Sequence, residues 1–140
     1  MRKIFALTAM AFACAPAARA DAPASHPYQV FATSVTCQYQ GDCAVFFPAI
    51  ANAGNTIIQH LSCEFALTGG SVVGAVLSGP TNNVRNIVPV FAFAAANGVT
   101  TYGINADTYL FFAKGVVPEV DVYSAGAPIQ DLNCTVSGYY

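Results

Sequence analysis

Residues 56–67 read Thr-Ile-Ile-Gln-His-Leu-Ser-Cys-Glu-Phe-Ala-Leu, and most of this stretch alternates apolar and polar side chains. Alternation with a period of two is typical of a β-strand that is buried on one face. The pattern predicts a core-facing set made of Ile57, Leu61, Cys63, Phe65 and Leu67. The opposite face is then expected to carry Ile58, His60, Ser62 and Glu64.

The rest of the chain is rich in Val, Ile, Phe, Tyr and Thr, and Gly, Pro and Asn interrupt it at short intervals. This composition is typical of β-structure. Strands are predicted over residues 28–37, 43–50, 56–67, 71–77, 84–95, 99–104, 108–114, 119–123 and 130–140. Nine short strands without a dividing linker indicate one all-β domain over residues 28–140, an antiparallel β-sandwich.

Residues 87–95, Ile-Val-Pro-Val-Phe-Ala-Phe-Ala-Ala, are apolar on both faces of the predicted strand. Such a strand is either covered on both faces or half exposed at an interface. Pro89 cannot donate a ladder hydrogen bond, which favours an edge strand or a bulge. Because an exposed apolar edge invites self-association, the predicted interaction surface consists of Val88, Val90, Phe91 and Phe93.

The first twenty residues have the pattern of a secretory signal peptide. Two basic residues precede the apolar stretch 4–15, which is too short to span a membrane, and Ala18 and Ala20 are the small residues of a cleavage site. We expect cleavage after Ala20, a flexible tail over residues 21–27, and a secreted or periplasmic location. Cleavage would leave two basic residues against seven acidic ones, a formal charge of −5.

Four cysteines would remain after Cys14 is removed with the signal peptide. An exported chain with an even number of cysteines is expected to form disulfides, and four cysteines allow three pairings. The five-residue spacing of Cys37 and Cys43 favours a bridge between neighbouring antiparallel strands. Cys63 and Cys134 would then join the centre of the chain to its last strand.

Candidate catalytic residues are His60, Ser62 and Glu64, which share one face of the predicted strand. Neighbours on one strand face lie about 6.5 to 7 Å apart, too far for a direct proton relay. We interpret the three as a polar stripe facing solvent. The chain also lacks nucleophile-elbow, phosphate-loop and zinc-protease motifs, so we expect no enzymatic activity, no cofactor and no metal site.

The charged fraction of 9%, without a basic cluster, argues against a nucleic-acid partner. No apolar run after the signal peptide is long enough for a spanning helix, so no membrane insertion is expected. Sugar-binding sandwiches stack sugar rings on aromatic side chains, and the aromatic pairs Phe111-Phe112 and Tyr139-Tyr140 are the candidates for this role. The absence of Trp argues against it.

Residues Thr56-Ile-Ile-Gln-His-Leu-Ser-Cys63 and Cys134-Thr-Val-Ser-Gly-Tyr-Tyr140 resemble a pattern found in small secreted bacterial proteins of unassigned function. The resemblance implies a jelly-roll-like sandwich in an exported protein, here stapled by two disulfides. The alternating last strand is also similar to the final strands of pilus subunits and of outer-membrane barrels. The prediction is an exported, non-catalytic binding or self-assembly module, with either another protein or a second copy as partner. A small hydrolase using His60 and a small outer-membrane barrel are the alternatives.

Overall fold

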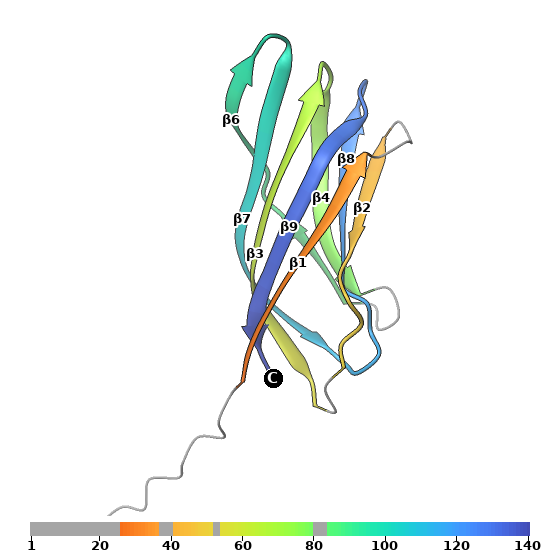
Figure 1. Ribbon diagram of the computed structural model, residues 1–140, viewed down its shortest axis with the longest axis vertical. Helices are drawn as coiled ribbons and strands as arrows, with labels where there is room; N and C mark the ends of the chain where they lie inside the picture. The colour runs from red at the N-terminus through yellow and green to blue at the C-terminus, as the bar shows by residue number, and fades with distance from the viewer. Residues whose placement is uncertain (1–25, 37–40, 52–53, 80–83) are drawn as a thin grey trace, which may run out of the picture.

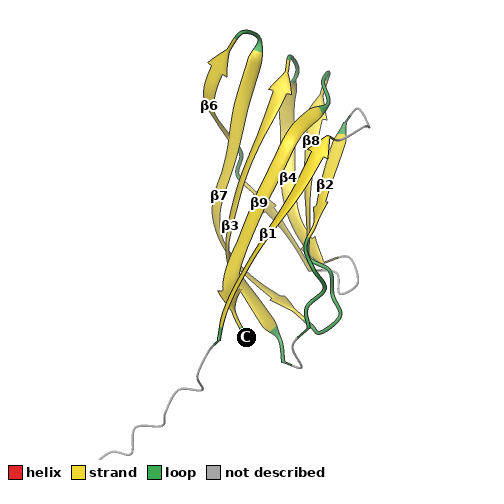
Figure 2. Cartoon of the chain, viewed as in Figure 1, coloured by secondary structure: helices red, strands yellow, loops and turns green. Residues whose placement is uncertain are grey.

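The computed structural model describes residues 26–36, 41–51, 54–79 and 84–140. Every regular element in this part of the chain is a β-strand (Figures 1 and 2). The strands are β1 Pro27–Thr36, β2 Asp42–Phe46, β3 Thr56–Thr68, β4 Ser71–Gly79, β5 Val84–Val88, β6 Phe91–Ala96, β7 Val99–Phe112, β8 Glu119–Ala125 and β9 Ile129–Tyr139. The all-β class expected from the sequence is confirmed. The predicted signal peptide and most of the predicted tail lie outside the described residues.

The described strands form two antiparallel sheets. The larger sheet has the order β1-β9-β3-β7-β6, and the smaller sheet has the order β2-β8-β4-β5. The pairing is nested along the chain, since β1 pairs with β9, β2 with β8, β3 with β7 and β4 with β5. Successive strands from β1 to β4 therefore alternate between the two sheets. In Figure 1 the larger sheet lies toward the viewer and the smaller one behind it.

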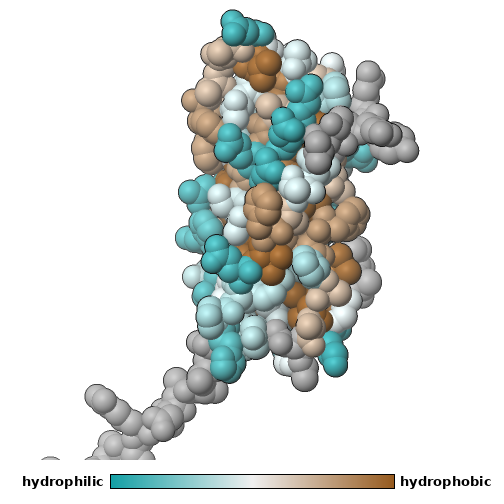
Figure 3. Space-filling model, viewed as in Figure 1, coloured by the Kyte–Doolittle hydropathy of each residue, from teal (hydrophilic) through white to brown (hydrophobic). Residues whose placement is uncertain are grey.

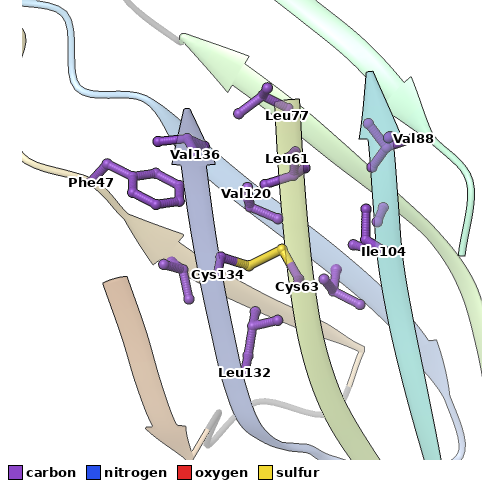
Figure 4. Close-up of a cluster of buried hydrophobic side chains, with 14 of the residues drawn as sticks. Phe47, Leu61, Cys63, Leu77, Val88, Ile104, Val120, Leu132, Cys134 and Val136 are labelled. Carbon is purple, nitrogen blue, oxygen red and sulfur yellow. A yellow bond between two sulfur atoms is a disulfide. The ribbon is translucent and has the colours of Figure 1, made fainter. Parts of the chain in front are cut away.

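Side chains from both sheets meet in one buried hydrophobic cluster (Figure 4). Leu61 on β3 and Val136 on β9 belong to it, and Leu77 and Val120 enter it from the smaller sheet. Burying one such side chain contributes about 1.5 to 3 kcal/mol. Leu61 is the member of this group that the alternation in residues 56–67 assigned to the core.

Cys63 and Cys134 form a disulfide inside this cluster. They occupy directly paired positions of β3 and β9, and their Cα atoms lie 4.1 Å apart. The predicted bridge between the centre of the chain and its last strand is confirmed. Cys37 lies outside the described residues, so its pairing with Cys43 stays a prediction.

The predicted face assignment is wrong at the start of β3. Ile58 is fully buried, whereas Ile57, which the alternation assigned to the core, is only half-buried. The register of β3 against both β7 and β9 shifts between Ile58 and His60. Such an irregularity adds a residue to one strand and reverses the faces that precede it, so the expected alternation holds only from Leu61 onward.

Three predicted strand boundaries also differ from those observed. Residues 84–95 form two strands that belong to different sheets, because the chain crosses from one sheet to the other at Pro89 and Val90. Residues 99–104 and 108–114 belong to one continuous strand, β7, whose exposed Asn105 and Asp107 do not interrupt the ladder. The second strand ends at Phe46 rather than at residue 50. Within the described ranges, no helix is long and apolar enough to cross a membrane.

Candidate functional site

β6 is the edge strand of the larger sheet, and it is exposed along its whole length. It pairs with β7 on one side and has no strand partner on the other side within the described part of the chain. All six of its residues, Phe-Ala-Phe-Ala-Ala-Ala, are exposed, and none is charged. An apolar edge of this kind is a template for the addition of another strand.

The position of β6 follows from the residues on either side of it. Pro89 precedes the strand and lies where the chain leaves the smaller sheet. Asn97 and Gly98 follow it and form the turn into β7, with φ angles of 53° and 79°. Two successive positive φ angles are typical of the tight hairpin turn that Asn-Gly favours. The Asn97-Gly98 turn thus explains the end of this edge strand, and the crossover at Pro89 sets its start.

An apolar groove of about 300 Å³ lies beside the start of β6. Val72, Val73 and Ile87 line it from the smaller sheet, and Val90 and Tyr102 line it from the crossover and from β7. Val73 and Ile87 are 71% and 79% exposed, which is high for branched aliphatic residues. In Figure 3 the upper left of the molecule, where Figure 1 places β6, is apolar, and the surface below it is hydrophilic.

Only some residues of the interaction surface predicted from the sequence are exposed in the structure. Phe91 and Phe93 are exposed on β6, as expected. Val88 is wrongly included, because it is 3% exposed and belongs to the core at the end of β5. Val90 is half-buried and packs against that core. The sequence did not reveal the crossover at Pro89, which directs the residues before and after it to different sheets.

His60 pairs with a residue that sequence reasoning did not select. Its Nδ1 lies 2.9 Å from Oδ1 of Asp107, which stands directly opposite on β7. Ser62 and Glu64 are exposed on the same strand, as the predicted polar stripe requires. Among the described residues, no hydroxyl group forms a hydrogen bond with His60. The carboxylate on a neighbouring strand was hidden from the sequence, because strand register is not local information.

Glu119 and Asp121 lie on the outer side of β8, while Val120 and Val122 between and after them are buried, as alternation predicts. Burial, a side-chain hydrogen bond to Asp121 and the negative charge of Asp121 together raise the pKa of Glu119 to about 7. The Glu119 carboxyl therefore holds its proton to a higher pH than an exposed glutamate does. No cluster of three or more His, Cys, Asp or Glu residues able to hold a metal ion occurs among the described residues.

Comparisons with protein-family models, with curated proteins and with solved structures found no match for this chain. Its activity must therefore be inferred from its own residues. The features that stand out in the described part are the apolar edge at β6, the groove beside it and the polar outer face of the larger sheet.

Proposed function

We propose that this protein is an exported, non-catalytic module that assembles with a second copy of itself by strand pairing along β6. The observation that carries the proposal is that β6 is an uncharged edge strand with all six residues exposed. Soluble proteins usually protect such edges with charge, proline or a covering segment. An edge left open in this way is better explained by a partner strand that covers it.

The fold proposed for this module is a jelly-roll β-sandwich. Nested pairing of β1 with β9, β2 with β8, β3 with β7 and β4 with β5 supports it. One long antiparallel hairpin rolled into two facing sheets produces this order of pairs. β6 is then an extra strand added at the edge beside β7, which is the place where a partner would dock.

Export to the periplasm or the cell exterior is the second part of the proposal. The signal-like pattern of residues 1–20 supports it, and so does the Cys63–Cys134 disulfide, which is typical of oxidising compartments. A second disulfide between Cys37 and Cys43 would belong to the same exported protein. Mass spectrometry of the mature protein tests this part: we expect an N-terminus at Asp21 and four oxidised cysteines.

The proposed contact places two β6 strands side by side, antiparallel, so that the larger sheets of two copies become continuous. Such a two-fold contact uses the same surface on both subunits. Ala92 and Ala95 pair with Tyr102 and Thr100 of β7, and their small side chains leave room for a partner to approach. The apolar groove beside Val90 would receive an apolar side chain of the second copy.

Light scattering coupled to size exclusion tests the assembly. We expect the wild-type protein to elute as a dimer at high concentration and Ala95→Lys to elute as a monomer, because a charge on the edge opposes strand addition. Ala113→Lys is the matched control, since Ala113 is exposed in the loop after β7. A wild type that stays monomeric at every concentration, or equal behaviour of the two variants, contradicts the proposal.

A small hydrolase is the second candidate, and the contact of His60 with Asp107 favours it. A carboxylate bound to Nδ1 orients a histidine that acts as a general base through its other nitrogen. Ser62 is the exposed hydroxyl two residues along the same strand. A panel of fluorogenic ester and peptide substrates tests this candidate: hydrolysis that His60→Ala and Asp107→Asn both abolish, with the fold intact, would favour it over a purely binding role.

A further inference from the structure

The outer face of the larger sheet carries a second hollow, separate from the groove beside Val90. It has a volume of about 290 Å³ and is open to solvent. Five polar side chains and two aromatic rings border it, namely Ser62, Glu64, Asn105, Asn133, Thr135, Phe91 and Phe93. Figure 3 views this face and shows a hydrophilic band across it beside apolar surface.

Strand register brings the five polar side chains together from three strands. Glu64 on β3 stands directly opposite Asn133 on β9. Ser62, two residues earlier, stands opposite Thr135 on β9 and Asn105 on β7. Directly opposite residues in a sheet have Cβ atoms about 4.5 to 5.5 Å apart. The hydroxyl, amide and carboxylate groups therefore form one compact polar cluster.

Asn133 is held in a fixed orientation within this cluster. The hydroxyl of Thr33 donates to Oδ1 of Asn133 at 2.5 Å, and Nδ2 of Asn133 donates to the carbonyl of Asp131 at 2.8 Å. One amide proton and one lone pair of Asn133 are left over after these bonds. Asn133 also lines the hollow, and a side chain that two hydrogen bonds already hold loses little freedom when a ligand binds, which favours affinity.

Phe91 and Phe93 form an aromatic wall on the side of the hollow nearest the sheet edge. They are 47% and 55% exposed, and their ring centroids lie 6.3 Å apart with the planes inclined at 50°. Gly103 lies directly opposite Phe91 on β7 and also borders the hollow. Without a side chain at that position, the Phe91 ring lies over β7 and extends the wall toward the polar cluster.

We propose that this hollow, which we call the outer-face cleft, binds one sugar unit of a neutral oligosaccharide. Sugars present hydroxyl groups around their rim and patches of C–H groups on their faces. The cleft offers the matching groups: amides, hydroxyls and a carboxylate that donate and accept hydrogen bonds, and aromatic rings on which a C–H face can stack. Its volume is at the lower end of the range for small-ligand sites.

Other ligand classes fit the outer-face cleft less well. β3, at its floor, is hydrogen-bonded to both β7 and β9, so an extended peptide finds no open strand edge there. The lining contains one carboxylate and no Lys or Arg, which disfavours nucleic acids and other polyanions. A neutral, hydroxyl-rich ligand is the class that matches both the polar groups and the charge.

Binding to an array of immobilised neutral glucans, mannans, galactans and xylans tests the proposal. We expect the wild-type protein to bind at least one of these glycans. Titration calorimetry with that glycan should then show affinity losses of tenfold or more for Asn105→Ala and for Phe93→Ala. Phe46→Ala is the matched control, because Phe46 is an exposed phenylalanine on the smaller sheet, and it should bind like the wild type.

The outcomes separate this proposal from strand pairing along β6. Ala95→Lys should keep full glycan affinity, since residue 95 does not line the outer-face cleft. Failure of the wild type to bind any glycan on the array would overturn the proposal. It would also be overturned by equal losses in Phe46→Ala and Phe93→Ala, or by a preference for an extended peptide over every glycan. Circular dichroism of each variant establishes that the sheets are intact.

Discussion

Gly103 on β7 lies directly opposite Phe91 on β6, and the Phe91 ring occupies the space next to the missing side chain. A Cβ atom at Gly103 would stand 2.9 Å from Cζ of Phe91 and 3.4 Å from Cδ1 of Phe93. Both contacts are to side chains that can rotate, not to backbone. Gly103 thus controls where the aromatic wall of the outer-face cleft lies, more than it controls the path of the chain.

Gly103→Ala is therefore expected to move the Phe91 ring while leaving the fold in place. The free energy of unfolding should change by less than about 1 kcal/mol, because overpacking is relieved by ring rotation. NMR spectra of the phenylalanine ring carbons should show a displaced Phe91 signal. Gly74→Ala is the control, since a Cβ at Gly74 would meet no atom within 4 Å. Unchanged Phe91 signals in Gly103→Ala would contradict the prediction.

Loss of the Cys63–Cys134 bridge should be the most damaging single change to the cysteines. The two residues are 71 positions apart, and a bridge closing a loop of that length stabilises by about 4 kcal/mol through the entropy of the unfolded chain. The predicted short bridge from Cys37 to Cys43 would contribute about 2 kcal/mol on the same basis. Cys134→Ser is expected to lower the melting temperature more than Cys43→Ser does.

Reduction of the wild-type protein separates the covalent bond from the change of side chain. Reductant opens both bridges, so the reduced wild type should match reduced Cys134→Ser and should be less stable than oxidised Cys134→Ser by about 2 kcal/mol, the contribution of the short bridge. Equal losses in Cys134→Ser and Cys43→Ser would contradict the larger role of the long bridge. A peptide map that linked Cys37 to Cys63 would contradict the pairing predicted for the remaining cysteines.

Local alternation was sufficient to predict much of the core. Leu61, Cys63, Phe65 and Leu67 are buried on β3 as the alternation of residues 56–67 predicts, because period two depends only on neighbouring residues. The strand edge could be expected from the apolar stretch that contains Phe91. The reversal of the two faces of β3 before His60 could not be expected from the sequence, because an irregularity in a ladder depends on the partner strands.

The two candidate sites depended on information that a single sequence does not display. The outer-face cleft collects residues near positions 63, 92, 104 and 134, which meet only through the register of β6, β7, β3 and β9. Asp107 reaches His60 through the same register. Strand register is fixed by the packing of whole strands. The local pattern therefore identified the polar residues of one strand but not the residues opposite them on the neighbouring strands. The aromatic wall was not evident from the sequence, because Phe91 and Phe93 border the cleft only when β6 is paired with β7.

Thr56 and Thr108 are both buried, but replacing each of them by valine is expected to change the free energy of unfolding in opposite directions. The hydroxyl of Thr108 donates to the carbonyl of Ile58 at 2.8 Å. The Thr56 hydroxyl is also buried and has no hydrogen-bond partner among the described residues. Valine has nearly the same shape as threonine but no hydroxyl. Thr56→Val should therefore raise the free energy of unfolding by about 1 kcal/mol, and Thr108→Val should lower it by about 1 kcal/mol. Urea denaturation of both variants is the measurement, and a stabilised Thr108→Val would contradict it.

Glu119 should make the stability of the protein depend on pH. Its pKa rises from 4.5 to about 7 in the folded protein, chiefly through burial and also through the hydrogen bond and charge of Asp121. The folded state therefore holds a proton that the unfolded state releases between these two values. The stabilising contribution of this proton is complete below the unfolded pKa and is lost as the pH rises through the folded one.

Glu119→Gln removes the titrating group and should flatten this dependence. The free energy of unfolding of the wild type should fall between about pH 5 and about pH 8, and the variant should lose about 1 kcal/mol less over that range, a modest value because solvent screens a half-exposed group. Glu64→Gln, at an exposed carboxylate of the other sheet, is the control for loss of charge. Urea denaturation at both pH values gives the difference directly. A steeper fall in Glu119→Gln than in the wild type would mean that Glu119 is not the group that retains the proton.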